Sequence, residues 1–171
     1  MKQHIYIFLL LALLSLSQKN KAQEQFTSRY NVTYVTMENG LLHNFISNIY
    51  KDSRGFLWVS TNGGGLSRYD GYEFVHYNLN TPKATLKSNF INGCCEDNFE
   101  RLWIISGEGI DVLDLKTNQI VIPSDPHGLL NTISQSSTTN IIKDSRGDLW
   151  LYSDNFVRKM IFHDDGSISK I

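Results

Sequence analysis

The segment KDSRGFLW at residues 51–58 returns almost unchanged as KDSRGDLW at residues 143–150. A third version, EDNFERLW, lies between them at residues 96–103 and keeps the aspartate, the leucine and the tryptophan. The tryptophans of the three versions are Trp58, Trp103 and Trp150. The steps between them are 103 − 58 = 45 and 150 − 103 = 47 residues. A period of about 45 residues is typical of a repeat architecture in which each repeat is one supersecondary unit.

Each repeat contains four short runs rich in aromatic and β-branched residues, and turn residues separate the runs. The runs are residues 45–52, 56–61, 66–70 and 72–78 in the first repeat, 91–97, 101–106, 110–115 and 118–123 in the second, and 138–144, 148–153, 156–162 and 167–171 in the third. Four antiparallel strands in every repeat of about 45 residues describe the blade of a β-propeller. We therefore expect an all-β chain, a partial β-propeller of about three four-stranded antiparallel blades in an open arc.

The pattern also predicts how the chain is organised along its length. A basic start, a short apolar run and small residues such as Ser15, Ser17 and Ala22 indicate a secretory signal peptide. An uncleaved membrane anchor is the alternative, although the apolar run is short for a bilayer. The expected parts are a signal peptide at 1–22, a leading segment at 23–41 with a ring-closing strand at 30–36, and blades at 42–80, 81–123 and 124–171, the last one degenerate. We expect no other membrane span and an exported, periplasmic protein.

The repeated phrase has a structural explanation. In DSRG, Asp occupies the first and Gly the fourth position of a type I turn, and the Asp side chain can cap backbone N–H groups inside the turn. The tryptophan that follows begins an apolar strand, and we expect it to fill the space between neighbouring blades. Glu100 replaces the turn glycine in the second repeat. The predicted structural repeat motif comprises Asp52, Gly55, Trp58, Gly65, Asp70, Asp97, Trp103, Gly109, Asp144, Gly147 and Trp150.

Composition restricts the function. Lys and Arg number 16 against 17 Asp and Glu, so nothing implies a nucleic-acid partner. The two cysteines, Cys94 and Cys95, are adjacent in an expected strand, where neighbours point to opposite faces. We interpret them as semi-buried apolar residues, and a function for them is left open. The five histidines follow no metal-binding pattern, and we expect no metal and no cofactor.

Residues 38–78, ENGLLHNFISNIYKDSRGFLWVSTNGGGLSRYDGYEFVHYN, resemble the two-component regulator propeller repeat. More closely, they resemble the amino-terminal start of the periplasmic sensor region of hybrid two-component systems. The extra glycine in NGGGL is a departure from the pattern. The resemblance implies a propeller that senses a ligand, often an oligosaccharide, and a full-length parent with a histidine kinase. We expect this chain to be the amino-terminal fragment of such a sensor, with ligand-binding residues that the sequence does not identify and no catalytic residue carried over.

Two other functions stay open from the sequence. One is a propeller module that assembles with other chains. The other is a carbohydrate-active enzyme, because D-x-x-G-x-x-W also resembles the aspartate boxes of sialidase-like propellers. Such an enzyme would need a distinguishable pair of carboxylates, which the sequence does not offer. The expected partners are the remaining propeller blades, from downstream sequence or from another chain, an oligosaccharide ligand, and further copies of the chain.

Overall fold

The computed structural model describes residues 32–134, 138 and 140–171. Residues 35–171 form a second unit of the chain, separate from residues 1–34, and the description below concerns this second unit. The predicted signal peptide lies outside the described residues. The predicted strand at 30–36 lies partly outside them, and its described part, residues 32–36, is not a strand. A strand needs a sheet edge with free N–H and C=O groups, and these residues pair with none within the described chain.

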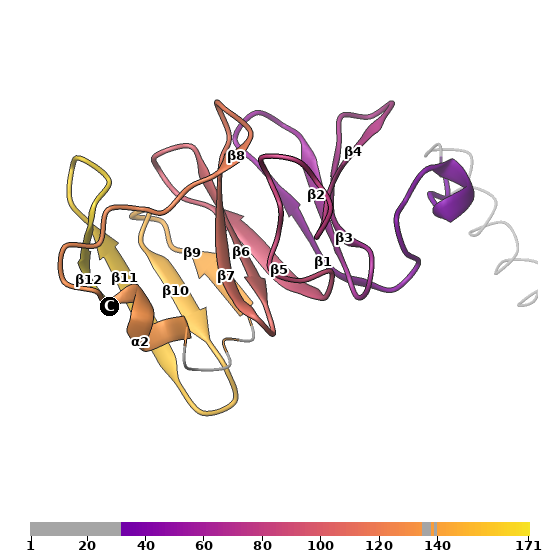
Figure 1. Cartoon of the computed structure of the whole chain (residues 1–171). Helices are drawn as coiled ribbons and strands as arrows, with labels where there is room; N and C mark the ends of the chain where they lie inside the picture. Colours follow the sequence, from indigo (N-terminus) through magenta and orange to yellow (C-terminus); the bar gives the residue numbers. More distant parts are fainter. Residues whose placement is uncertain (1–31, 135–137, 139) are drawn as a thin grey trace, which may run out of the picture. The chain divides into compact units, whose positions relative to one another are not determined.

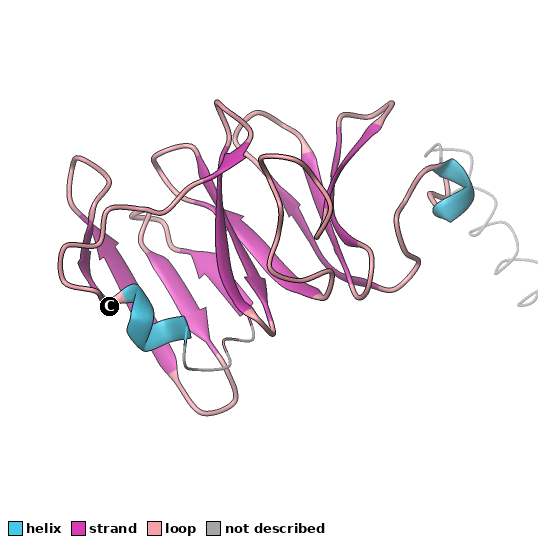
Figure 2. Cartoon of the chain, viewed as in Figure 1, coloured by secondary structure: helices cyan, strands magenta, loops and turns pink. Residues whose placement is uncertain are grey.

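The second unit is built from three four-stranded antiparallel sheets, each continuous in sequence (Figure 1, Figure 2). Sheet 1 contains β1 (Ile46–Lys51), β2 (Leu57–Thr61), β3 (Gly65–Tyr69) and β4 (Phe74–Tyr77). Sheet 2 contains β5 (Ile91–Glu96), β6 (Arg101–Ser106), β7 (Gly109–Asp114) and β8 (Gln119–Ile120). Sheet 3 contains β9 (Asn140–Lys143), β10 (Leu149–Tyr152), β11 (Val157–Phe162) and β12 (Ile168–Lys170). The prediction of an all-β chain with three four-stranded blades is confirmed.

Sheet 1 packs on one face of sheet 2, and the side chains between them form the first hydrophobic cluster. Trp58 projects from β2 into this cluster and is fully buried. It meets Leu102, Ile104 and Leu113 of sheet 2, which alternate with residues of the opposite face as the pleat requires. The linker that follows β4 adds Ala84 and Leu86 to the same cluster.

Sheet 3 packs on the other face of sheet 2, and Trp103 of β6 is the large side chain of this second cluster. Trp103 is fully buried against residues of sheet 3 that include Leu149, Leu151 and Met160. Sheets 1 and 3 thus flank sheet 2 on opposite faces. This order of the sheets is the one expected for the predicted open arc. The predicted position between two sheets agrees with the structure for Trp58 and Trp103. Trp150 instead lies half-buried on the face of sheet 3 that no other described sheet covers.

The adjacent cysteines mark the two faces of sheet 2. Cys94 belongs to the first cluster and Cys95 to the second, and both are free, buried thiols. Burial raises the pKa of Cys94 to about 12 and the pKa of Cys95 to about 11. Both therefore remain protonated thiols at neutral pH, and they act as small apolar side chains of the interfaces.

Two local features differ from the sequence prediction. The expected strand at 118–123 is only two residues long, β8, because Pro123 has no N–H to donate to the neighbouring β7. The carbonyl oxygen of Ile110 in β7 accepts a hydrogen bond from Lys87 Nζ instead, at 2.6 Å. A short helix, α2 (Leu130–Ser134), lies in the linker before sheet 3, and its five residues are too few for a periodic signal. A 3-10 turn, η1 (Met37–Asn39), precedes sheet 1.

Replacement of either interfacial tryptophan by alanine should destabilise the protein strongly. We expect Trp58→Ala and Trp103→Ala each to lower the free energy of unfolding by about 3–5 kcal/mol, since each leaves a large cavity in a packed interface. Urea unfolding followed by circular dichroism measures the change. Trp150→Ala is the matched control, because Trp150 is only half-buried. An equal loss in all three variants would contradict the assignment of the first two to sheet–sheet interfaces.

Candidate functional site

The turn between β1 and β2 is organised around the carboxylate of Asp52. Its Oδ1 accepts hydrogen bonds from the backbone N–H groups of Arg54 and Phe56, at 3.0 and 2.9 Å. Its Oδ2 accepts the indole N–H of Trp58 at 2.9 Å. Asp52 is 4% exposed and Trp58 is 0% exposed, so one buried carboxylate satisfies the turn and the interfacial ring together.

The same arrangement recurs in the other two sheets. Asp97 Oδ1 accepts the N–H groups of Phe99 and Arg101 at 2.8 and 3.1 Å, and its Oδ2 accepts the Trp103 indole at 2.8 Å. In sheet 3, Asp144 Oδ2 accepts the Trp150 indole at 3.0 Å, and its Oδ1 accepts the N–H groups of Arg146 and Asp148 at 2.9 and 3.1 Å.

The sequence predicted the backbone caps of these aspartates but not their hydrogen bonds to the indoles. A signal for those bonds was present, because each tryptophan follows its aspartate by six residues, as in Asp52 and Trp58. In each sheet the turn brings the two side chains back together on one side. We call this arrangement the Asp–Trp clamp.

The glycines of the motif lie in turns or at the first residue of a strand. Gly55 and Gly147 have positive φ at the fourth turn position, and Gly65 and Gly109 have positive φ at the starts of β3 and β7. Gly65 is also tightly packed, since a Cβ there would clash with the carbonyl oxygen of Tyr77.

Asp70 closes the turn between β3 and β4. Its Oδ1 accepts the backbone N–H groups of Tyr72 and Glu73, at 2.7 and 2.8 Å. The motif residues are therefore distributed over separate turns and interfaces in all three sheets.

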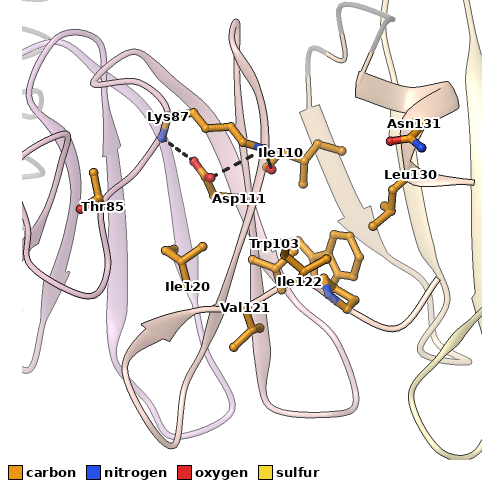
Figure 3. A pocket seen from close by; sticks show the side chains of 12 residues that line it. Thr85, Lys87, Trp103, Ile110, Asp111, Ile120, Val121, Ile122, Leu130 and Asn131 are labelled. Carbon is orange, nitrogen blue, oxygen red and sulfur yellow. Dashed lines mark hydrogen bonds and ion pairs between the residues drawn. The ribbon is translucent and has the colours of Figure 1, made fainter. Parts of the chain in front are cut away.

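A cavity of about 460 Å³ lies at the outer edge of sheet 2, where β8 is short (Figure 3). Its apolar wall includes Val112, Val121 and Ile122. In Figure 3, Leu130 and Asn131 project from α2 on the other side of this cavity.

The polar side of the cavity carries a lysine and an aspartate. The backbone N–H of Lys87 donates to Asp111 Oδ2 at 2.8 Å, and Lys87 Nζ lies 3.9 Å from Asp111 Oδ1. Burial raises the pKa of Asp111, while the Lys87 N–H and the Lys87 ammonium oppose this rise. The volume is within the range of small-molecule sites, and the wall is mostly apolar with a few polar groups. The cavity can hold a small amphipathic molecule, and its carboxylate is paired with the lysine.

Among the residues that the structure describes, no group of three or more His, Cys, Asp or Glu side chains is placed to hold a metal ion. In the described part of the chain, no helix is long and apolar enough to cross a bilayer.

Residues 40–63 match the family described as two component regulator propeller. The extracellular domain of the hybrid two component system BT3049 from B. thetaiotaomicron aligns with a TM-score of 0.62 and 20% identity, over 81% of this chain and 20% of that chain. Two structures of the extracellular domain of BT4673 from the same organism align with TM-scores of 0.55 and 0.54, each at 26% identity over 77% of this chain and 19% of that chain. No match to a curated protein is found.

These likenesses define the fold of the chain as a segment of a β-propeller, built from blades with Asp–Trp clamps. The match of residues 40–63 to the two component regulator propeller falls within the segment 38–78, where the sequence predicted that resemblance. The chain spans about a fifth of the length of the extracellular domains that it resembles.

The clamp of sheet 3 should make stability depend on acidity. The Trp150 indole N–H and then the backbone N–H groups of Arg146 and Asp148 lower the pKa of Asp144 to about 2, against the opposing effect of burial. A carboxyl with a depressed folded-state pKa stabilises the fold above its unfolded pKa of about 3.9, and that contribution disappears as the pH falls towards 2. We expect Asp144→Asn to lower the urea midpoint at pH 7 and to flatten its decline between pH 4 and pH 2. Parallel slopes for the variant and the parent would contradict this role.

The turn of sheet 2 offers a position for stabilisation. Glu100 has a φ of +58° at the place where Gly55 and Gly147 have +94° and +91°. A side chain in this left-handed region is strained, so Glu100→Gly should raise the free energy of unfolding by about 1 kcal/mol, after the larger entropy of glycine in the unfolded chain is included. Glu100→Ala is the control, because it removes the same ion pair with Lys116 but keeps the Cβ. A gain of equal size in both variants would assign the effect to the charge instead of the backbone.

Proposed function

We propose that this chain is the amino-terminal part of a periplasmic, ligand-sensing β-propeller of a hybrid two-component sensor. Export by a signal peptide at residues 1–22 and a response to carbohydrate are part of the proposal. The observation that carries it is the combination of three blades, each with an Asp–Trp clamp, with the likeness to extracellular domains of hybrid two-component systems. An extracellular domain must leave the cytoplasm, which fits the basic and apolar start of the sequence.

The hydrogen bonds of the clamp aspartates favour a function in ligand binding over one in catalysis. The three aspartates that resemble the aspartate boxes of sialidase-like propellers each accept an indole N–H and two backbone N–H groups. Their oxygens are thereby engaged in the fold. A glycoside hydrolase needs two carboxyl groups that face a substrate across the scissile bond, one of them able to deliver a proton. The clamp aspartates support a scaffold role, and we propose that the chain has no catalytic activity of its own.

A second function, assembly with further propeller sheets, is supported by the outer face of sheet 3. Ile142 is 54% exposed and Val157 is 66% exposed on this face, beside the half-buried Trp150. Exposed apolar side chains grouped on one sheet face indicate a surface that another element covers. The two functions are compatible, because a sensor propeller is itself assembled from such sheets.

The sensing function is tested by disruption of the gene in its source organism and growth on a panel of purified oligosaccharides. We expect one class of carbohydrate to lose its induced transcripts in the disrupted strain, and the response to return when the intact gene is supplied. Complementation with a gene that lacks residues 2–22 is the matched control and should not restore the response, because the product would remain in the cytoplasm. Unchanged induction on every carbohydrate would contradict carbohydrate sensing.

A further inference from the structure

The contact between sheets 1 and 2 includes two hydrogen bonds between Ser53 and Glu96, beside the apolar interface. Glu96, the last residue of β5, is 2% exposed. Its Oε2 accepts the backbone N–H of Ser53 at 2.7 Å, and its Oε1 accepts the Ser53 hydroxyl at 2.8 Å. A buried carboxylate requires such donors, so removal of either partner leaves the other one unsatisfied. Both oxygens of one side chain thus recognise one serine of the neighbouring sheet.

Ser53 and Arg54 are the middle residues of the repeated phrase DSRG. Asp52 holds the turn from inside, while Ser53 and Arg54 point to the next sheet. Arg54 Nη1 donates to the carbonyl oxygen of Leu115 at 2.9 Å, beyond the end of β7. The segment DSRG therefore has two structural roles. Its aspartate stabilises the turn, and its serine and arginine bind the following sheet.

The contact between sheets 2 and 3 uses other residues at the same positions. The turn of sheet 2 reads Asp-Asn-Phe-Glu, and the residue before Asp144 in sheet 3 is Lys143 in place of a glutamate. The Asn98 side chain lies directly over Gly147. Phe99 meets the edge of Phe162 with ring centroids 5.7 Å apart. Where the turn lacks serine and arginine, the following sheet lacks the acidic residue.

Sheet 3 repeats DSRG, with Ser145 and Arg146 both exposed. The hydroxyl of Ser145 has no hydrogen-bond partner among the residues that the structure describes. Trp150 stands on the same side of its sheet as Trp58 and Trp103 do in theirs, yet it is half-buried where they are 0% exposed. We call this surface the Trp150 face; it consists of Trp150, Ile142, Tyr152, Val157 and Lys159, which the strand register places on one side.

We propose that the Trp150 face binds another β-sheet, and that this sheet carries an acidic residue immediately before its own turn aspartate. That carboxylate accepts the backbone N–H and hydroxyl of Ser145, as Glu96 does with Ser53. Arg146 donates to a backbone carbonyl of the same sheet, as Arg54 does with Leu115. The inference rests on the proposed function, in which this chain is part of a larger propeller, and it adds the residue by which the next sheet is recognised.

A second copy of this chain does not match that description. The face that it would offer is the outer face of sheet 1, which no other described sheet covers and where Ile49 is 59% exposed and Leu57 is 37% exposed. On that face the residue before Asp52 is Lys51, which is paired with Leu57 in the register. An ammonium cannot accept the Ser145 donors, and it would be placed near the guanidinium of Arg146. The partner is therefore a sheet with the Glu-Asp pattern of residues 96–97.

A fusion tests the proposal with a sheet of known sequence. The full chain is extended after Ile171 by a second copy of residues 79–120, in which Trp103→Phe removes the added indole. Because Trp58 and Trp103 of the parent are 0% exposed, acrylamide quenching of tryptophan fluorescence reports on Trp150. We expect the appended sheet to protect Trp150 from quenching.

Glu96→Lys in the appended copy should lower the equilibrium constant for docking by about tenfold or more. The fluorescence of Trp150 should then be quenched by acrylamide again. Ser145→Ala in the parent should have the same direction of effect. Glu108→Lys in the appended copy is the matched control, since it makes the same charge change at an exposed hairpin and should leave the protection intact.

Three results would overturn the proposal. One is an appended sheet that leaves Trp150 open to acrylamide. Another is equal protection by the Glu96→Lys copy. The third is protection of Trp150 in the unfused chain that rises with protein concentration, which would assign the face to a second copy. None of these depends on the carbohydrate response, so failure of the recognition rule and failure of the sensing function are separate results.

Discussion

The hydrogen bond between a turn aspartate and the indole of a tryptophan six residues later supports the rest of this structure. A buried carboxylate is costly without donors, and a buried indole N–H is costly without an acceptor. The Asp–Trp clamp resolves both costs with one contact, at 2.9 Å in sheet 1 and 2.8 Å in sheet 2. It also fixes the ring on one side of its sheet, so that the next sheet has a defined apolar surface to cover. Turn geometry and packing between sheets are therefore coupled in every repeat.

The two occupied interfaces show how the same clamp accommodates different neighbours. Sheet 2 meets sheet 1 through a carboxylate that binds a serine, and it meets sheet 3 through aromatic packing. At the second interface Arg101 binds Asp97 at 2.7 Å and also lies over the ring of Phe162, at 5.3 Å from its centroid. The clamp is constant, whereas the residues around it vary from one interface to the next. The residues around the clamp therefore make the two interfaces of sheet 2 chemically different.

Much of the fold could be predicted from the sequence because the signals are local. The period of the tryptophans, the turn residues around Asp52 and the alternation through Cys94 and Cys95 each depend on a few consecutive residues. The features that were missed depend on contacts between distant residues. Pro123 ends its strand early, and the exposed carbonyl of Ile110 is then bonded by Lys87 from another linker. The cavity beside them exists only once these segments are packed, so no run of residues could have indicated it.

The consecutive cysteines of β5 give each interface its own chemical reporter. Each thiol is sealed in a separate hydrophobic cluster, and a protonated, inaccessible thiol reacts slowly with alkylating reagents and oxidants. Separation of sheet 1 from sheet 2 would release Cys94, while separation of sheet 3 would release Cys95. Local opening on one side of the blade thus becomes distinguishable from opening on the other by which of two neighbouring residues is modified. In an oxidising compartment the intact packing is also what keeps both sulfurs from forming bonds to other chains.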